Sequence, residues 1–509
     1  MIRDIRNIVR LLMIARTLAR HDALFPLESL GVAQPIIALA KLVSRRRQPG
    51  RPGQRLARAL QEAGPSFIKL GQALSTRPDI LGEEVAADLS ALQDRADPFP
   101  GSEARATIEH DLGAPIAHLF RRFDDVPVAA ASIAQVHRAI DTKGRDVAVK
   151  VLRPGIEDAF HRDLDLFFWV AELIERARPD LRRLRPTDSM STLAETVEIE
   201  MDLRFEAAAA AELAENFADD PDFVIPRVDW SRTAQRVLTI EWVDGIPIDD
   251  RDGLIKAGHD PEAVIAKAAQ AFFLQVFRDG FFHADLHAGN LFVRADGSVV
   301  AVDFGIMGRL DRSTRHSLAE LLLGFLSRDY RRAAEVHFEA GWVPMHRSVA
   351  AFTQACRSIG EPIMDKPQNE ISVGHLLGQL FQITKTFEME VQTDLLLLQR
   401  TILVAEGTGR ALCPDANMWL LARPLMERWM ASALSPDVRV REAARELGTT
   451  LARLPEIVRS LESLAASLAD GSVRLHPQTI RALRGEDRRA STTVVWISIV
   501  FIVVLIVLA

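Results

Sequence analysis

Three polar residues in the middle of the chain have the order and spacing of a phosphoryl-transfer site. Asp285 and Asn290 lie five residues apart in the segment HADLHAGN, residues 283–290. Asp303 follows the β-branched run VVAV and begins the triplet DFG. Phosphoryl transfer needs a carboxylate at the attacking oxygen and metal ions on the phosphates. We therefore predict that Asp285 is the base and that Asn290 and Asp303 bind Mg²⁺ through oxygen atoms.

A lysine that contacts the phosphates is expected upstream of these residues. Lys150 ends the motif VAVK in an alternating β-branched run, the position in which a kinase lysine meets phosphate oxygens and a helix glutamate. Glu206, in an alanine-rich helical segment, is the predicted partner. Glu241 and Val243 lie where two lobes would join. Backbone groups there could hold an adenine edge, although a plain linker would have the same sequence.

The histidines beside Asp285 allow a second interpretation. His283 and His287 have the i, i+4 spacing of a zinc pair, but the chain offers no convincing third ligand and the wrong glutamate pattern for a zincin. Cys356 and Cys413 are far apart and in no metal spacing, so they indicate neither a disulfide framework nor a zinc site. Magnesium-dependent chemistry is the favoured interpretation.

Short strands and long helices are predicted to position these residues. Residues 126–155 predict strand, turn and strand, with TKG at the turn, and residues 236–248 predict a further strand and a Gly turn. Helices are predicted over 156–178 and about 188–217, and the chain is mostly helical from about 260 onward. The predicted fold class is α+β, with a small sheet-rich lobe followed by a large helical lobe.

The segment before Lys150 departs from an ordinary protein kinase. Where a Gly-rich phosphate loop is expected, the chain has AAASIAQVH, and an alanine methyl group would lie where backbone amides approach phosphates. No A-P-E triplet follows Asp303, so a platform for peptide substrates is not recognisable. The residues predicted to cover the nucleotide are Val128, Ala129, Ala130, Ala131, Ser132, Ala134 and Gln135.

Charge and apolar residues gather at opposite ends of the chain. The net charge is −7, yet residues 1–60 carry 12 Lys or Arg against 3 acids. A basic segment on an acidic body is typical of proteins that meet nucleic acid or an anionic membrane. Residues 494–509 carry no charge and would span roughly 24 Å as a helix, slightly less than a bilayer core. This apolar end favours a membrane, so we expect no nucleic-acid partner.

The first 20 residues predict an amphipathic helix. Arg3, Arg6, Arg10, Arg16 and Arg20 fall within an arc of roughly 140° in a helix. That arrangement suits a helix that lies on an anionic lipid surface. A mitochondrial transit peptide has similar chemistry, and a helix packed on the protein surface is a third interpretation.

Six motifs together resemble the UbiB family of atypical, protein-kinase-like proteins, also called aarF-domain-containing kinases. The resemblance runs from about residue 20 to the tail. Each motif alone is weak, but six in family order are a strong signal. They are KLGQ (69–72), continued as ALSTRPD; the Ala-rich loop; VAVKVLRPG; EMD (200–202), with FEAAA after it; HADLHAGN; and DFG (303–305).

The resemblance implies a bilobal kinase-like fold in which the helical extension with KLGQ lies over the active site. Lys69 and Gln72 would approach the nucleotide, with Lys69 near Glu200 and Lys150 near Glu206. Such a lid would hinder protein substrates. Similar proteins are thought to act as ATPases, with ATP and Mg²⁺, that support ubiquinone biosynthesis. Their proposed ligands are lipid-like phenolic intermediates and anionic lipids such as cardiolipin.

The arginines just before the apolar segment, Arg481, Arg484, Arg488 and Arg489, are expected to stay on the cytoplasmic side by the positive-inside preference. We expect the catalytic body on the cytoplasmic face of the cell inner membrane, with the mitochondrial inner membrane as the alternative. Many bacterial relatives end in two apolar helices, whereas one apolar segment is visible here. The topology of the tail and the formation of a homodimer through it therefore stay open.

Two other functions are compatible with the sequence. HADLHAGN also resembles the loop of aminoglycoside phosphotransferases, so a small-molecule phosphotransferase is one rival. A non-catalytic scaffold or lipid-binding module that needs nucleotide only for its shape is the other.

The predicted regions are a basic N-terminal region (1–50), a helical extension with KLGQ (51–115), an N-lobe (116–245), a C-lobe (246–430), a helical tail (431–490) and a transmembrane or membrane-inserted segment (491–509).

Overall fold

The structure, a computed structural model, describes most of the chain up to residue 413. The predicted tail and membrane segment, 431–509, fall in a separate unit (430–509) that lies outside the described residues. Among the described helices, none has the length and apolar character needed to cross a membrane. The described residues are 2–26, 49–75, 81–90, 92, 97–177, 186–362, 383, 386–389 and 393–413.

An antiparallel sheet of five strands carries Lys150. Its order is β1-β3-β4-β6, with β2 paired to β3. Along β4, Val147, Val149 and Val151 are buried, whereas Lys150 lies on the opposite face because side chains alternate along a strand. The strands predicted within 126–155 and 236–248 are therefore confirmed. The strands are β1 (Phe120–Phe123), β2 (Ala129–Ala130), β3 (Ala134–Asp141), β4 (Asp146–Leu152) and β6 (Val237–Glu241).

The helix predicted over about 188–217 is in fact two helices. α11 (Pro186–Glu200) ends and α12 (Leu203–Asn216) begins around Asp202. The carboxylate of Asp202 accepts a hydrogen bond from the backbone N–H of Arg204 at 3.1 Å. An Asp in this capping position starts a new helix, so the prediction of one continuous helix is wrong. The break places Glu200 and Glu206 on different helices, and both line one cavity.

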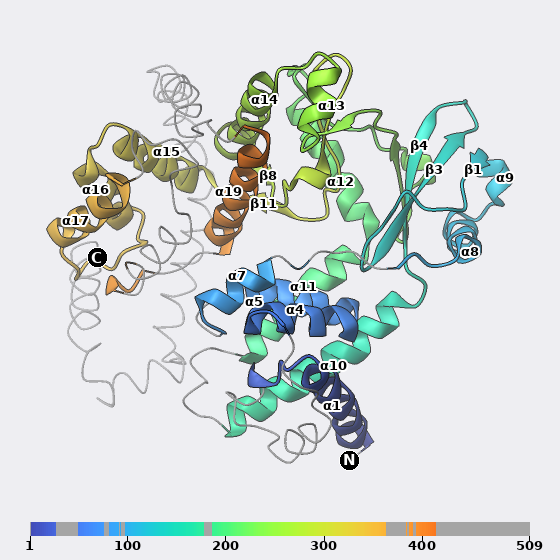
Figure 1. Cartoon of the computed structure of the whole chain (residues 1–509), viewed down its shortest axis with the longest axis horizontal. Coiled ribbons are helices and arrows are strands. Elements are labelled where there is room, and N and C mark those ends of the chain that lie inside the picture. The colour runs from blue at the N-terminus through green and yellow to red at the C-terminus, as the bar shows by residue number, and fades with distance from the viewer. Residues whose placement is uncertain are drawn as a thin grey trace, which may run out of the picture. The chain divides into compact units, whose positions relative to one another are not determined.

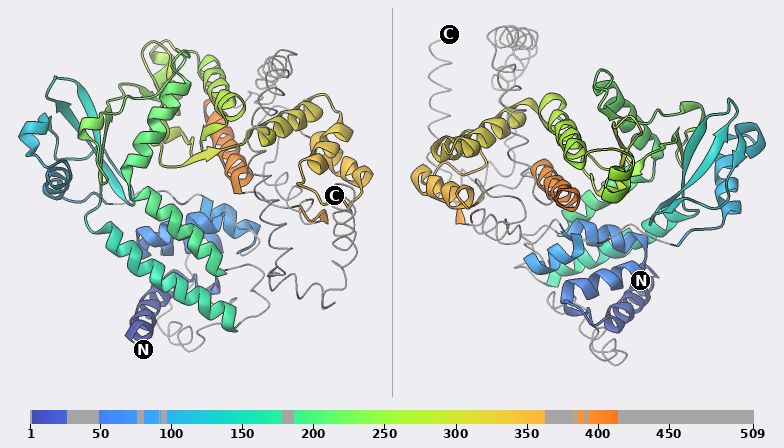
Figure 2. Two further views of the ribbon diagram at one scale, coloured as in Figure 1. Left: turned by 180° about the vertical axis from the view of Figure 1, so that it is seen from behind. Right: turned by 45° about the horizontal axis from the view of Figure 1, so that its top comes forward.

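The extension forms a helical layer with two helices that the sequence assigned to the N-lobe. The blue helices α1, α4, α5 and α7 lie against α10 and α11 (Figures 1 and 2), and most of them share one apolar core. Phe67 of α5 packs edge-on against Phe167 of α10, with ring centroids 5.1 Å apart. Conversely, α8 (Gly101–Leu112) packs with the N-lobe sheet. The other bounds are α1 (Ile2–Arg20), α4 (Pro52–Ala63), α5 (Pro65–Ser75), α7 (Glu83–Ser90) and α10 (Ile156–Ala177).

Helix α1 is packed on the protein rather than presenting all of its arginines to solvent. Arg6 donates to Asp165 of α10 at 2.5 Å, and Arg10 pairs with the buried Asp163. Leu11, Ala15 and Leu18 of the same helix are buried. Two of the five arginines predicted to face lipid, Arg6 and Arg10, thus form ion pairs with α10. The apolar residues that α1 leaves exposed are Ile8, Val9 and Met13.

The larger lobe is mostly helical, as predicted, and contains two small sheets. One has the order β5-β10-β9-β7, and the other pairs β8 with β11 (Figure 1). The strands are β5 (Phe223–Val224), β7 (Ile246–Pro247), β8 (Phe281–His283), β9 (Leu291–Val293), β10 (Val299–Ala301) and β11 (Met307–Arg309). The helices of this lobe are α13 (Arg251–Lys256), α14 (Pro261–Phe273), the π-helix η3 (Leu274–Asp279), α15 (Arg312–Leu326), α16 (Tyr330–Glu339), α17 (Val349–Gly360) and α19 (Thr393–Leu412). The short helix α9 (Ile116–Leu119) belongs to the N-lobe, and two 3-10 turns are η2 (Trp230–Arg232) and η4 (Ala288–Asn290).

Gly308 of β11 is required by close packing next to the HADLHAGN loop. Gly308 pairs with Phe282 of β8, whose ring is fully buried. A Cβ atom at position 308 would lie 2.1 Å from that ring. Moving the Phe282 ring aside would leave a gap in the core next to His283, because protein interiors are close-packed.

We predict that Gly308→Ala lowers the free energy of unfolding by about 2 kcal/mol, the usual cost of overpacking a core. Chemical denaturation would measure the change. Gly407→Ala is the matched control, because Gly407 is exposed on α19 and a Cβ atom there would contact nothing within 4 Å. A Gly308→Ala protein as stable as this control would contradict the packing argument.

Candidate active site

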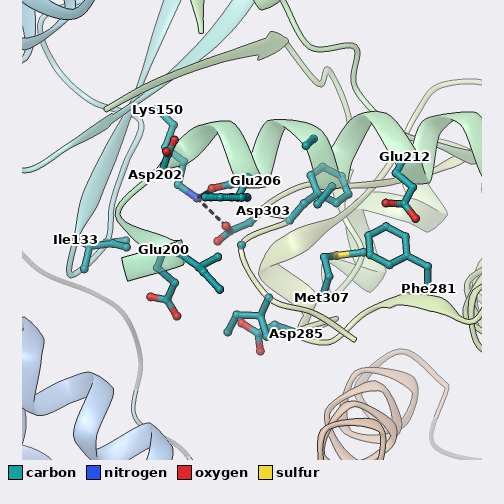
Figure 3. Close-up of a pocket in the computed structure, with 18 of the residues that line it drawn as sticks. Ile133, Lys150, Glu200, Asp202, Glu206, Glu212, Phe281, Asp285, Asp303 and Met307 are labelled. Atoms are coloured by element: carbon teal, nitrogen blue, oxygen red, sulfur yellow. Dashed lines mark hydrogen bonds and ion pairs between the residues drawn. The ribbon is translucent and has the colours of Figure 1, made fainter. Parts of the chain in front are cut away.

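Lys150 joins two carboxylates that come from distant parts of the chain. Its Nζ atom donates to both oxygens of Glu206 at 2.9 Å and to Oδ1 of Asp303 at 2.7 Å (Figure 3). Lys150 is on β4, Glu206 is in the first turn of α12, and Asp303 follows β10. The contact between Lys150 and Glu206 that the resemblance implied is therefore present. The interaction ties the N-lobe sheet to the DFG segment of the other lobe.

Burial and charge act in opposite directions on these three groups. Burial alone would lower the pKa of Lys150, but the nearby carboxylates of Asp303 and Glu206 outweigh it and raise that pKa. Burial raises the pKa of Glu206 to about 7, against the attraction of Lys150. The positive charge of Lys150 holds the pKa of Asp303 well below its usual range. Lys150 and Asp303 thus stay charged at neutral pH, while Glu206 is the member that titrates.

Asp303 has a backbone conformation that L residues rarely adopt. Its φ angle is +65°, in the left-handed region. The conformation aims the carboxylate at the cavity, where half of the side chain is exposed. Strain of this kind is common at functional sites, because the surrounding structure must hold it in place.

The HADLHAGN loop holds Asp285 and Asn290 beside the DFG segment. The side-chain nitrogen of Asn290 donates to the backbone carbonyl of Asp285 at 3.0 Å. The carbonyl of Asn290 accepts from the N–H of Val302, the residue before Asp303, at 2.9 Å. The amide nitrogen of Asn290 is thus used inside the loop. The Asn290 side chain is buried and does not line the cavity, so its role as a metal ligand stays a prediction.

His283 is a structural support for this loop and not a zinc ligand. The backbone N–H of Asp285 donates to Nδ1 of the His283 ring at 3.1 Å, and Nε2 contacts the carbonyl of Val302 at 3.1 Å. Both ring nitrogens are therefore in use, and burial lowers the pKa of the ring. Gln275, in the π-helix η3, accepts from the N–H of His283 at 2.9 Å. Among the described residues, no cluster of three His, Cys, Asp or Glu side chains could hold a metal ion.

The KLGQ helix reaches the site through one buried ion pair. Nζ of Lys69, on α5, lies 2.8 Å from Oε2 of Glu200, and both side chains are at most 9% exposed. Lys69 and Glu200 line the same cavity as Lys150. Gln72, one turn further along α5, is half-buried and does not line the cavity. Its approach to the nucleotide stays a prediction.

Only part of the predicted nucleotide loop lines the cavity. Ala131 and Ile133 do so, whereas Val128 is exposed and lies outside the lining. Gln135 is fully buried, and its side chain binds the main chain of Phe99, accepting from N–H at 3.0 Å and donating to the carbonyl at 3.2 Å. The Gln135 side chain is thus used inside the N-lobe and does not line the cavity, and the nucleotide role of Gln135 stays a prediction. The other members are Ala129 and Ala130 in β2 and the buried Ser132 and Ala134.

Glu241 and Val243 lie at the end of the N-lobe sheet and outside the cavity lining. The N–H of Glu241 donates to the carbonyl of Arg227 at 2.9 Å. Its carboxylate lies 3.4 Å from Arg227 and 3.8 Å from Arg294. The adenine-binding role of this segment stays a prediction.

The cavity lining mixes charged and apolar side chains, and the Arg309 guanidinium lies over the Phe281 ring, 4.3 Å from its centroid. The volume of the cavity is about 380 Å³. Phe281 and Met307 lie together away from Lys150 (Figure 3). Phe205, whose exposed fraction is 56%, also lines the cavity, and the Arg309–Glu212 ion pair, 2.8 Å long, borders it. A ligand with a polar group near Asp285 and an apolar body would match this lining.

Comparison with known proteins identifies the family. The chain matches the model of the ABC1 atypical kinase-like domain over residues 91–337 and that of the UbiB helical domain over 356–417. It is 43% identical to "Probable protein kinase UbiB" of Marinobacter nauticus over 86% of this chain and 81% of that protein. The chain belongs to the UbiB family. The relative of the same name from Xanthomonas axonopodis pv. citri is 40% identical over 96% of this chain and 91% of its own length.

A solved structure supports the kinase-like fold of this UbiB family member. The complex of Rv3197 with erythromycin, from Mycobacterium tuberculosis, is 27% identical, with a TM-score of 0.51. The similarity covers 72% of this chain and 93% of that protein.

The UbiB helical domain contributes two contacts that the sequence did not indicate. Arg400, on α19, lies 3.5 Å from Oδ1 of Asp285. The hydroxyl of Thr401, the next residue, donates to the buried carbonyl of Ala284 at 3.1 Å. Helix α19 thus holds the HADLHAGN loop from a position more than 100 residues downstream. No local motif marks Arg400 or Thr401, so only the fold could identify them.

The raised pKa of Glu206 predicts a pH dependence of stability. In the folded protein Glu206 keeps its proton up to about pH 7, whereas its ordinary pKa is 4.5. Between these values the folded state binds more protons than the unfolded state, so the free energy of unfolding falls as pH rises. We expect the wild type to lose stability relative to Glu206→Gln between about pH 5 and about pH 8. Denaturation curves at both pH values measure this, and parallel losses in the two proteins would contradict it.

Proposed function

We propose that this protein is a Mg²⁺-dependent, kinase-like ATPase that supports ubiquinone biosynthesis at a membrane. The observation that carries the proposal is the position of Lys150, held by Glu206 and Asp303 in the lining of a cavity. A lysine, a helix glutamate and a DFG aspartate in contact are the parts that bind and orient nucleotide phosphates in kinases. The UbiB names of its relatives support the pathway.

The residues present fit ATP and Mg²⁺. Asp303 offers a half-exposed carboxylate, and Asn290 offers an amide oxygen. Mg²⁺ usually takes one or two protein oxygens together with phosphate oxygens and water. Asp285, which lines the cavity, would orient the attacking water or hydroxyl, and Lys150 would hold the phosphates. Bound Mg²⁺ would supply charge neutralisation on the phosphates.

The apolar side chains in the cavity lining support a lipid-like ligand. Phe205, Phe281 and Met307 would contact the ring or chain of a quinone precursor, while its polar group faces Asp285. Burial of apolar area is the main favourable term in such binding. ATP turnover would then drive the handling of the precursor. The small-molecule phosphotransferase stays the alternative, because the same geometry could transfer phosphate to a hydroxyl group.

Membrane association is a proposal that rests on the ends of the chain. Helix α1 exposes Ile8, Val9 and Met13 beside the basic residues Arg16 and Arg20. An exposed apolar stripe beside arginines suits insertion at the surface of an anionic, cardiolipin-like membrane. The apolar segment 491–509 would anchor the body to the cytoplasmic face of the inner membrane of the cell, or of the mitochondrion as the alternative. Quinone-pathway proteins and a second copy of the chain are proposed partners.

ATP hydrolysis by the full chain on vesicles containing anionic lipid tests the proposed function. We predict Mg²⁺-dependent hydrolysis that Asp303→Asn reduces at least 100-fold, because it removes a charged metal ligand. Asp296→Asn is the matched control. Asp296 holds the turn between β9 and β10, accepting from the N–H of Ser298 at 2.9 Å, and an asparagine oxygen can accept the same bond. This variant should retain wild-type hydrolysis.

Quinone profiles of cells lacking the protein separate the rivals. Rescue by wild type and not by Asp303→Asn supports the proposal. Rescue by both would favour the scaffold, and a phosphorylated metabolite found only with wild type would favour the phosphotransferase. Unchanged quinones and precursors after deletion would overturn the link to ubiquinone.

A further inference from the structure

Arg153 directly follows β4, the strand that carries Lys150. It contacts the Ala-rich hairpin, which is formed by β2, β3 and the turn between them. Its Nε atom donates to the carbonyl of Ser132 at 3.1 Å, and Nη2 donates to the carbonyl of Ala131 at 3.3 Å. The backbone N–H of Arg153 donates to the carbonyl of Ile133 at 2.8 Å. One residue therefore binds three successive carbonyls at the tip of the hairpin.

These bonds determine which side of the hairpin tip faces the cavity. Ala131 and Ile133 line the cavity, but Arg153 does not. The carbonyl oxygens of Ala131, Ser132 and Ile133 therefore point toward Arg153, which lies outside the cavity lining. A carbonyl oxygen carries partial negative charge and would repel phosphate oxygens. By drawing these oxygens away, Arg153 removes a repulsive group from the place where phosphates would bind.

The tip of the hairpin is a two-residue turn. The N–H of Ala131 donates to the carbonyl of Ala134 at 2.7 Å, which leaves a turn of only Ser132 and Ile133. The tip carries no glycine. Because the turn lacks the backbone freedom that glycine provides, an outside contact can select one conformation for it.

Arg153 also connects the hairpin to the segment between α7 and α8. Its Nη2 atom donates to the carbonyl of Asp97 at 2.6 Å, and its guanidinium lies over the Phe99 ring, 5.3 Å from the centroid. Phe99 is fixed in turn by the two hydrogen bonds to the buried Gln135 side chain. A planar guanidinium can bind several carbonyls and stack on a ring at the same time, which a lysine ammonium cannot do.

We propose that Arg153 is a positioning residue for nucleotide binding, which fixes the Ala-rich hairpin by binding the carbonyls of Ala131 and Ser132 and anchoring them to Asp97 and Phe99. The inference rests on the proposed ATP-binding function. It assigns to the VLRPG motif a role in nucleotide affinity, because Arg153 acts through the hairpin and does not reach the cavity itself.

The test compares Arg153→Gln and Arg153→Lys with Arg138→Gln in the full chain. Arg138 is a matched control: it also lies on the N-lobe sheet, donates to Asp146 at 3.1 Å and stacks on Trp242 at 4.8 Å, but away from the hairpin. For Arg153→Gln we expect the Kd and KM for Mg²⁺-ATP to rise about tenfold, as loss of charge-assisted hydrogen bonds implies, with kcat changed less than about twofold. Arg153→Lys should recover little of this loss, and Arg138→Gln should bind like wild type.

Hydrogen exchange of the nucleotide-free proteins gives a second readout. Amides of residues 129–134 should exchange faster in Arg153→Gln than in wild type, while those of β4 stay protected. Wild-type affinity and wild-type exchange in Arg153→Gln would overturn the inference and leave the ATPase proposal intact. A wild-type protein that binds no nucleotide would overturn both. A fall in kcat without a change in Kd would also overturn the positioning role, because it would place Arg153 in the chemical step.

Discussion

The contact of one lysine with two carboxylates organises this protein. Lys150 comes from the N-lobe sheet, Glu206 from α12 and Asp303 from the DFG segment of the second lobe, so their contact joins the two lobes. Leaving the mostly buried Lys150 ammonium without its carboxylate partners would be costly. Two local features accompany this contact. Asp202 begins a new helix, which carries Glu206 toward the lysine, and Asp303 adopts a φ angle of +65°.

The same arrangement explains why the other elements gather at this place. The KLGQ helix adds the buried Lys69–Glu200 pair beside it, and α19 adds Arg400 next to Asp285. The extension and both lobes thus contribute residues to the cavity lining, and the UbiB helical domain contacts Asp285 from α19. Phe281 and Met307 lie in the same lining away from Lys150 (Figure 3). The proposed lipid-linked ATPase rests on this combination of the Lys150 contacts with apolar side chains in one cavity.

The sequence predicted the parts of this site that depend on local pattern. Alternating valines marked β4 and placed Lys150 on the face opposite the core, and the order of the DFG and HADLHAGN motifs marked the loop that lies beside Asp303. The metal-binding role of Asn290 and Asp303 stays a prediction. Contacts that depend on tertiary packing could not be predicted from the sequence. Gln135 lies in a motif predicted to cover nucleotide, yet its side chain binds Phe99, and nothing in its neighbourhood indicates this. The break at Asp202 was missed because helical periodicity continues across it, and Arg400 was missed because only tertiary folding brings α19 to Asp285.

We infer that the carboxylate of Asp303, which contacts Lys150, is a Mg²⁺ ligand of a nucleotide site. Calorimetric titration of the full chain with ATP, in the presence and absence of Mg²⁺, tests it most directly. The account predicts that Mg²⁺ tightens ATP binding to wild type and that this gain is lost in Asp303→Asn, while a weaker, Mg²⁺-independent affinity remains through Lys150. Equal ATP affinity with and without Mg²⁺, unchanged by Asp303→Asn, would contradict it.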